Sequence, residues 1–390
     1  MIRSKFLAAL SFAMLLAGPA SAQPPQDIFV RQAASSDSDG RLLLDVQFGR
    51  PGAAGKLRAR LLATKRPDAA FAADGWSALC IASDRTGRFR QAVADCTASQ
   101  AADPAHGGED TLVFMRQLAH APVSAAHGAA LTPIDADGNI ALVAGSYAGP
   151  ALADTGATLA VMMQSVADAA GVRVLGQSRN VATSTAPVSG QVGIIPRVAI
   201  AGATVENLPV LVLPDAQLTY DGGKVRIPFL LSLSALRAFG RVAWLDHGTM
   251  FALGDRAPAL SPGAVPVFWH PLGIGLPLDG PGGRLAAHFD TGSNATFLFE
   301  PGLALVSDSE RAALIQSTRR VGGVGGVVSE DIRRLPTATL GLAGQPFVLT
   351  NAVVAATPQN GEAARIGEDM FKRYATAVLD FRAMEFSLVP

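Results

Sequence analysis

The hydrophobic pattern divides the chain into two parts with different periods. From Arg41 to about His120, apolar residues recur at three- and four-residue spacing, which is the period of an amphipathic helix. From about residue 128 to Pro390, short runs of Val, Ile, Leu and Ala are separated by Gly and Pro every 8–12 residues, a pattern typical of β-sandwiches and barrels. The sequence therefore predicts a mainly β fold with an N-terminal α-helical segment.

Two helices joined by a short turn are predicted between Trp76 and Pro104. Their apolar faces consist of Trp76, Leu79 and Cys80 in the first helix and of Phe89, Ala92 and Cys96 in the second. This spacing resembles one tetratricopeptide repeat, with Cys80 where the repeat usually has Gly. Because stacked repeats need about three copies for stability, we expect a helical hairpin within residues 41–122 that packs against the rest of the protein.

Cys80 and Cys96 are the only two cysteines of the chain, and they lie on facing sides of the predicted hairpin. A disulfide between them would close a loop of about 17 residues and add about 3 kcal/mol in the chain-entropy model. The alternative is that both are small core residues. We favour the disulfide, because the N-terminus indicates export to a compartment where disulfides persist.

Residues 1–22 have the layout of a secretory signal. Arg3 and Lys5 precede an apolar run from Phe6 to Leu16, and small residues lead to a cleavage site after Ala22. A membrane anchor would need about 20 apolar residues, which is longer than this run. Residues 23–40 are polar and predict a flexible leader. We therefore expect an exported protein, periplasmic or secreted, with no membrane span after signal cleavage.

The charge balance excludes several classes of partner. The chain has 32 Lys and Arg against 32 Asp and Glu, and cleavage of the signal leaves 30 − 32, or −2. Such a balance provides no electrostatic basis for binding nucleic acid. The six His and two Cys show no zinc-ligand spacing, so we expect neither a metal nor a cofactor.

The β region is a tandem repeat that is anchored by two Asp-Thr-Gly triplets. The triplets begin at Asp154 and Asp290, 136 residues apart, and each follows two short strands with a Gly-containing turn. Each copy ends in a similar strand, marked by Asp246 and Asp380, 92 and 90 residues after its triplet. Two anchors kept in register across both copies indicate a duplicated structure rather than a chance recurrence. We expect structural roles for Asp246 and Asp380.

These segments resemble the lobes of retropepsin-type aspartic peptidases. The triplets lie in Leu152–Ala157 and His288–Ser293, where His288 departs from the usual apolar residue. A late apolar-Gly segment is present as 365–367, whereas 230–232 has Ser232 in place of Gly. The resemblance covers about residues 128–390. It implies two tandem acid-protease-like β lobes, 128–256 and 262–390, paired on one chain as in the pepsin-like pseudo-dimer.

The resemblance implies that Asp154 and Asp290 activate a water for hydrolysis of a peptide bond. Two close carboxylates that share one proton supply both a base and an acid, which is the general logic of aspartic proteases. Support of the active-site loops is assigned to Thr155, Gly156 and Ala157 and to Thr291, Gly292 and Ser293. In this arrangement the threonines cross-link the two loops, the glycines permit close approach, and Ser293 hydrogen-bonds its carboxylate.

Glycine-rich segments about 30 residues after each triplet are flap candidates. The candidate residues are Ser189, Gly190 and Gly193 in the first copy and Gly322, Gly323, Gly325 and Gly326 in the second. Glycine would give such hairpins the freedom to move as lids. A phosphate-binding loop is not predicted, because no Lys-Ser or Lys-Thr follows the glycines.

Three functional hypotheses follow. The first is an aspartic endopeptidase, a monomer whose lobes pair within one chain and whose partner is a protein or peptide substrate. The second is a non-catalytic envelope-binding module that uses the hairpin and lobes for recognition, with the two aspartates as ordinary turn residues. The third retains catalysis but pairs lobes between two chains. The hairpin could equally pack on the lobes or cover the cleft.

His288 and two arginine pairs have open roles. Because His288 lies two residues before Asp290, both side chains are on one strand face, where the imidazole could tune the aspartate pair or be exposed or satisfied elsewhere. The pairs 319–320 and 333–334 are expected to be solvated charges.

Overall fold

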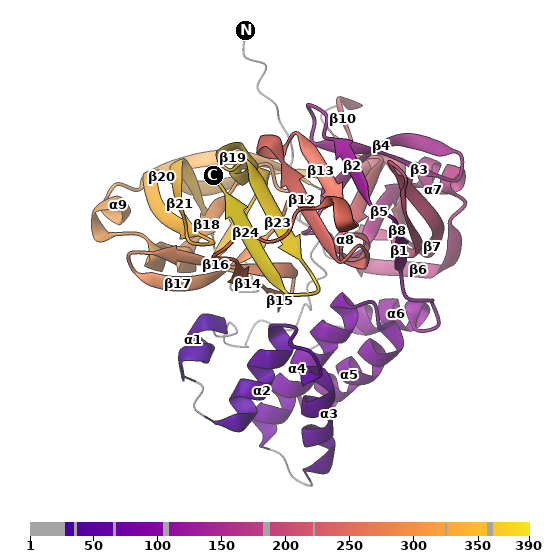
Figure 1. Ribbon diagram of the computed structural model, residues 1–390, viewed down its shortest axis with the longest axis horizontal. Coiled ribbons are helices and arrows are strands. Elements are labelled where there is room, and N and C mark those ends of the chain that lie inside the picture. Colours follow the sequence, from indigo (N-terminus) through magenta and orange to yellow (C-terminus); the bar gives the residue numbers. More distant parts are fainter. Residues whose placement is uncertain are drawn as a thin grey trace.

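The computed structural model of the protein describes residues 28–34, 37–64, 68–103, 109–181, 188–220, 223–323, 326–356 and 362–390. The predicted signal at 1–22 and residues 23–27 of the predicted leader lie outside these ranges. The described chain is mainly β, with barrel-like sheets and an N-terminal helical region (Figure 1). This confirms the predicted fold class.

The helical region has more helices than the predicted hairpin. They are α1 (Ile28–Ala34), α2 (Ser38–Gln47), α3 (Ala53–Ala63), α4 (Ala69–Arg85), α5 (Phe89–Ala102) and α6 (Glu109–Leu118). The predicted hairpin corresponds to α4 and α5, which the expected disulfide between Cys80 and Cys96 joins. The carboxylate of Asp68 caps the start of α4 by accepting a hydrogen bond from the backbone N–H of Phe71.

The prediction of a flexible leader over 23–40 is wrong where it overlaps α1 and the start of α2. Ile28 is buried with Phe48 and Phe268, and the Phe29 ring packs edge-on against that of Phe268 at 5.7 Å between centroids. The segment is polar on average, so its composition did not indicate that Ile28 and Phe29 are buried. Their burial depends on contacts with Phe268, which is far along the chain.

The first barrel-like sheet contains eight strands. They are β1 (Ala125–His127), β3 (Asn139–Ala144), β4 (Tyr147–Asp154), β5 (Ala160–Met163), β6 (Arg173–Val181), β7 (Val188–Ile200), β8 (Ala203–Leu213) and β11 (Phe229–Ser232). Their order is β1-β8-β5-β11-β4-β3-β7-β6, and the additional pairing of β7 with β8 curls the sheet on itself. Two helices, α7 (Gln164–Ala170) and α8 (Leu233–Ala238), and a two-stranded ribbon of β9 (Thr219–Tyr220) and β10 (Val225–Arg226) accompany it.

The second barrel-like sheet repeats this plan. Its strands are β15 (Phe268–His270), β16 (Gly273–Gly280), β17 (Gly283–Phe289), β18 (Phe297–Phe299), β19 (Ile315–Gly323), β20 (Gly326–Leu342), β21 (Gln345–Ala355) and β22 (Ala364–Ile366). Their order is β15-β16-β17-β22-β18-β21-β20-β19, with β16 also paired to β20. A short helix, α9 (Asp308–Ala312), precedes β19. Short 3-10 helices are η1 (Asp215–Leu218), η3 (Asp246–Gly248), η4 (Gly254–Arg256), η5 (Glu300–Leu305) and η6 (Glu368–Arg373).

A six-stranded central sheet joins the two halves. Its strands are β2 (Ala130–Pro133), β12 (Arg241–Leu245), β13 (Met250–Leu253), β14 (Val265–Pro266), β23 (Thr376–Asp380) and β24 (Glu385–Val389), in the order β14-β24-β23-β12-β13-β2. The antiparallel pair of β12 and β23 is the seam between the halves. Asp380 is structural there, because its carboxylate pairs with Arg241 at 2.9 Å and accepts the backbone N–H groups of Arg382 and Ala383.

The helices gather on one side of the β body and contact both halves (Figure 1). Helix α6 contacts β6 of the first sheet, whereas α4 contacts β15 and α1 contacts β17 of the second. Within the described ranges, no helix combines the length and apolarity needed to cross a lipid bilayer. The helical region is packed on the β body through α1, α4 and α6.

Candidate active site

The two Asp-Thr-Gly segments stand at equivalent places in the two barrel-like sheets. Asp154 is the last residue of β4, which pairs in parallel with β11, so that Asp154 is opposite Ser232. Asp290 directly follows β17, which pairs in parallel with β22. Both carboxyl groups are fully buried. Each aspartate therefore stands at the end of a strand that pairs in parallel with a later strand of its own sheet.

The two threonines cross-link the loops by reciprocal hydrogen bonds. The hydroxyl of Thr155 accepts from the N–H of Thr291 at 3.0 Å and donates to the carbonyl of Phe289 at 2.7 Å. The hydroxyl of Thr291 accepts from the N–H of Thr155 at 3.0 Å and donates to the carbonyl of Ala153 at 2.7 Å. The matched distances make a two-fold arrangement, which fixes the position of one loop relative to the other.

Each glycine of the triplets faces the carboxylate of the opposite loop. A β-carbon at Gly292 would lie 2.5 Å from Oδ2 of Asp154, and one at Gly156 would overlap the carboxylate of Asp290. Only glycine permits this approach, because any side chain would push the loops apart. The close packing at these glycines is between the two loops rather than within one loop.

The environment of Asp154 opposes its negative charge. Burial, and next the negative charge of Asp290, raise the pKa of Asp154 well above its ordinary value. Hydrogen bonds to Oδ1 from the backbone N–H groups of Gly156 at 2.8 Å and Ala157 at 3.2 Å act in the opposite direction. A hydrogen bond between the side chains of Asp154 and Asp290 also raises the pKa of Asp154. The pair therefore has a proton to share.

Two serines lie close to the aspartates: Ser293 follows Asp290 by three residues, and Ser232 is the strand partner of Asp154. The hydroxyl of Ser293 donates to the carbonyl of Ala295 at 2.8 Å. Ser232, which replaces a glycine, is fully buried and shares a 2.7 Å hydrogen bond with the hydroxyl of Ser234.

The replacement at position 232 leaves the loop geometry intact. The N–H of Leu233 donates to the carbonyl of Ala157 at 2.8 Å, and the N–H of Glu368 donates to the carbonyl of Ser293 at 2.8 Å. Equivalent backbone hydrogen bonds therefore close the loop after Asp154 and the loop after Asp290. Gly367 is required in the second copy, where a β-carbon would lie 2.5 Å from the carbonyl oxygen of Ala295.

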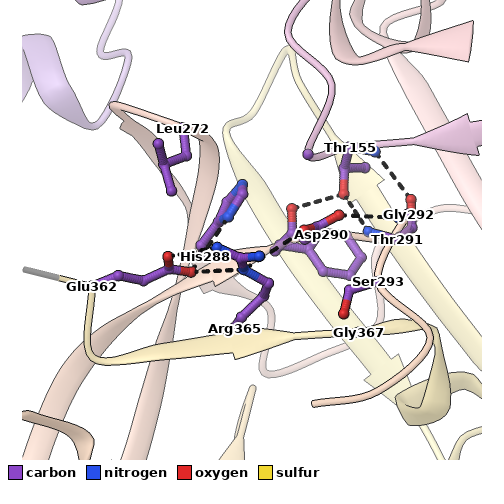
Figure 2. Close-up of polar contacts among 12 residues, drawn as sticks. Thr155, Leu272, His288, Asp290, Thr291, Gly292, Ser293, Glu362, Arg365 and Gly367 are labelled. Carbon is purple, nitrogen blue, oxygen red and sulfur yellow. Dashed lines mark hydrogen bonds and ion pairs between the residues drawn. The ribbon is translucent and has the colours of Figure 1, made fainter. Parts of the chain in front are cut away.

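A buried ion pair beside Asp290 was not foreseen from the sequence. Figure 2 shows Arg365 between Asp290 and Glu362. Its Nε lies 3.7 Å from Oδ2 of Asp290, and Nε and Nη2 donate to the carboxylate of Glu362 at 3.1 and 2.9 Å. Burial opposes the charge of Glu362, but Arg365 and then His288 keep its pKa below the ordinary range. Arg365 therefore places a positive charge 3.7 Å from Asp290, and its charge also acts on Asp154, which forms no ion pair within the described residues.

His288 belongs to the same buried cluster. Its Nδ1 lies 3.5 Å from Oε1 of Glu362, and its ring stacks on that of His270 with centroids 5.3 Å apart. The side chain is fully buried, so the alternative of an exposed His288 is wrong. Burial, and next the charge of His288, lower the pKa of His270 to about 3. The one sequence signal for this cluster was the position of His288 two residues before Asp290, on the same strand face.

The flap candidates lie on two hairpins. Ser189, Gly190 and Gly193 are in β7, whose hairpin partner is β6. Gly322 and Gly323 end β19, and Gly326 begins β20, with Gly323 paired to Gly326. Gly325 lies outside the described residues.

The arginines of the second hairpin are not simply solvated as predicted. Arg319 pairs with Glu330 across the hairpin and lies over the Phe297 ring at 4.5 Å from its centroid. Arg333 pairs with Glu300. These contacts connect the hairpin to the body of the second sheet.

Among the residues that the structure describes, no group of three or more His, Cys, Asp or Glu side chains is arranged so that it could hold a metal ion.

Comparison with known proteins agrees with this geometry for the first half. Residues 141–234 match the family model described as aspartyl protease. The match runs from β3 into α8 and includes Asp154, Thr155 and Gly156. No curated protein matches the chain. The chain therefore contains, within residues 141–234, a segment of aspartyl protease type.

Proposed function

We propose that the protein is an aspartic endopeptidase whose catalytic pair, Asp154 and Asp290, is formed by two lobes of one chain. The observation that carries the proposal is the reciprocal bonding of Thr155 and Thr291, which holds the two aspartate loops in a two-fold arrangement. A single-chain pair makes a monomer the expected active form. The match of the first half to an aspartyl protease family supports the same reaction class.

The proposed mechanism depends on the different surroundings of the two carboxyl groups. Because burial and the neighbouring charge raise the pKa of Asp154, and Arg365 faces Asp290, we assign the shared proton to Asp154 and the negative charge to Asp290. A water between them gives a proton to the carboxylate as its oxygen attacks the peptide carbonyl carbon. The protonated carboxyl donates to the carbonyl oxygen. Collapse of the tetrahedral intermediate then breaks the C–N bond. Asp290 passes the proton that it took from the water to the departing amine nitrogen, and a hydroxyl of the intermediate returns its proton to Asp154.

The proposed substrate is a protein or peptide, and the proposed location is the periplasm or the cell exterior. The disulfide between Cys80 and Cys96 supports an oxidising location. The N-terminal sequence, with Arg3 and Lys5 before an apolar run, supports export.

The proposal is tested by digesting an unfolded protein between pH 3 and pH 8 with the wild type and with Asp154→Asn and Asp290→Asn. Each variant is expected to lose at least about 100-fold in rate, because each removes one member of the acid–base pair. Asp246→Asn is the matched control, since Asp246 is an exposed strand-end aspartate and asparagine tolerates its left-handed backbone. Full activity in either active-site variant would overturn the proposal, and absence of cleavage by the wild type would favour a binding module.

A further inference from the structure

A cavity of about 390 Å³ lies where the helical region meets the β body. Its walls come from the turn between α2 and α3, the α4–α5 turn, the end of α8 and the turn between β23 and β24. The apolar part of the wall includes Trp269, Phe381 and Met384. The cavity is separate from the aspartate pair, since neither aspartate nor its loop lines it.

The charges that line this cavity are all positive. They are the guanidinium groups of Arg50, Arg58, Arg88, Arg237 and Arg382, and no Asp or Glu is among the lining residues. Arg58 is neutralised, because Asp95 accepts hydrogen bonds from its Nε at 3.1 Å and its Nη2 at 2.7 Å. For the other four, no carboxylate of the described residues is within ion-pair distance. Four cations therefore surround one cavity without a counter-charge from the described chain.

Arg237 shows the effect of this missing counter-charge. Its Nη2 donates to the carbonyl of Thr86 at 2.9 Å, but its Nε is buried and has no hydrogen-bond acceptor among the described residues. Burial, and next the positive charge of Arg88, lower the pKa of Arg237. By contrast, Asp279 raises the pKa of Arg284 on the surface of the second sheet. A buried cation next to a like charge is costly unless an anion compensates it.

We propose that this cavity binds a small anion that carries at least two phosphate or carboxylate groups. Guanidinium forks bind such oxygens in pairs, and several of them around one space favour a multivalent anion over chloride. The volume is within the usual range of small-molecule sites, about 300–1,000 Å³. The apolar wall adds a surface for the carbon skeleton of an organic anion.

The bound anion links three parts of the molecule. Arg50 and Arg88 belong to the helical region, Arg237 to α8 beside the first sheet, and Arg382 to the turn after β23. An anion shared among them holds the helices against the β body. The inference does not depend on peptidase activity, so the two proposals fail or succeed separately.

The test measures binding of inorganic pyrophosphate and of citrate to the full mature chain by calorimetry and thermal unfolding at constant ionic strength. We expect one saturable site per chain and a rise in Tm of about 4 °C at a ligand concentration of about 100 times Kd. Arg237→Gln and Arg88→Gln are each expected to raise Kd at least about tenfold, because each removes charge-assisted hydrogen bonds. Arg88 is exposed, so its variant keeps the fold.

The control is Arg197→Gln, which changes an exposed arginine of β7 outside the cavity and is expected to leave Kd unchanged. Binding of pyrophosphate alone would identify a phosphate ligand, and binding of citrate alone a carboxylate ligand. The proposal is overturned if neither anion binds saturably, or if Arg88→Gln and Arg237→Gln bind as tightly as the wild type.

Discussion

Replacement of Thr291 by valine tests whether the threonine cross-link holds the two aspartate loops together. Valine has nearly the shape of threonine but cannot donate to the carbonyl of Ala153 or accept from the N–H of Thr155. Thr155 is fully buried and Thr291 nearly so, and water therefore cannot replace the lost hydroxyl without rearrangement. The substitution changes hydrogen bonding at almost constant volume.

The expected cost comes from the two groups left behind. A buried donor or acceptor without a partner costs about 1–3 kcal/mol, so the N–H of Thr155 and the carbonyl of Ala153 together predict a loss of about 3 kcal/mol. Thr291→Ser is the matched control, because it keeps the hydroxyl and loses only a methyl group, at a cost of about 1 kcal/mol.

The free energy of unfolding is measured by urea titration with tryptophan fluorescence, which includes the signal of Trp244 in the central sheet. Peptide cleavage is measured in parallel, and a loss of at least about tenfold is expected because a shifted loop misplaces its carboxylate. Equal free energies of unfolding for Thr291→Val and Thr291→Ser would refute the reasoning, since the hydroxyl would then contribute nothing.

Two further predictions concern close packing and pH. Gly292→Ala is expected to reduce the rate of peptide cleavage at least about 100-fold, because its β-carbon would lie 2.5 Å from the carboxylate of Asp154. Gly55→Ala is the control and is expected to keep full activity, because a β-carbon at Gly55 has no other atom within 4 Å. Burial lowers the pKa of His270 to about 3 in the folded protein, whereas the pKa of an unfolded histidine is about 6.5. Between pH 3 and pH 6.5 the unfolded state therefore binds a proton at His270 more readily than the folded state does. The free energy of unfolding should therefore fall by up to about 1.4 kcal/mol for each pH unit from 6.5 towards 3, and His270→Gln should flatten that dependence in urea titrations.

Local patterns in the sequence were sufficient for the fold class, and they located the two Asp-Thr-Gly loops that the structure brings together. The triplets at Asp154 and Asp290 are contiguous and repeated, so their equivalence could be seen without a structure. The disulfide between Cys80 and Cys96 also follows from helical periodicity, since both cysteines lie on the facing sides of two neighbouring helices.

The surroundings of the site depend on contacts that no local pattern records. Glu362 and Arg365 are far from Asp290 along the chain, and their approach results from the parallel pairing of β17 with β22. The arginine-lined cavity likewise brings together Arg88 and Arg382, which are 294 residues apart in the sequence. Charge counts cannot detect either feature, because the chain as a whole has a formal net charge of zero.

The most direct test of the single-chain catalytic pair is the rate at which a 1:1 mixture of Asp154→Asn and Asp290→Asn cleaves one defined peptide. If both aspartates of each active site come from one chain, neither variant contains an intact pair and mixing cannot create one. The mixture is then expected to be as inactive as either variant alone, beside a fully active wild type. Recovery of a substantial fraction of wild-type activity on mixing would contradict the account, because it would require a site formed between two chains.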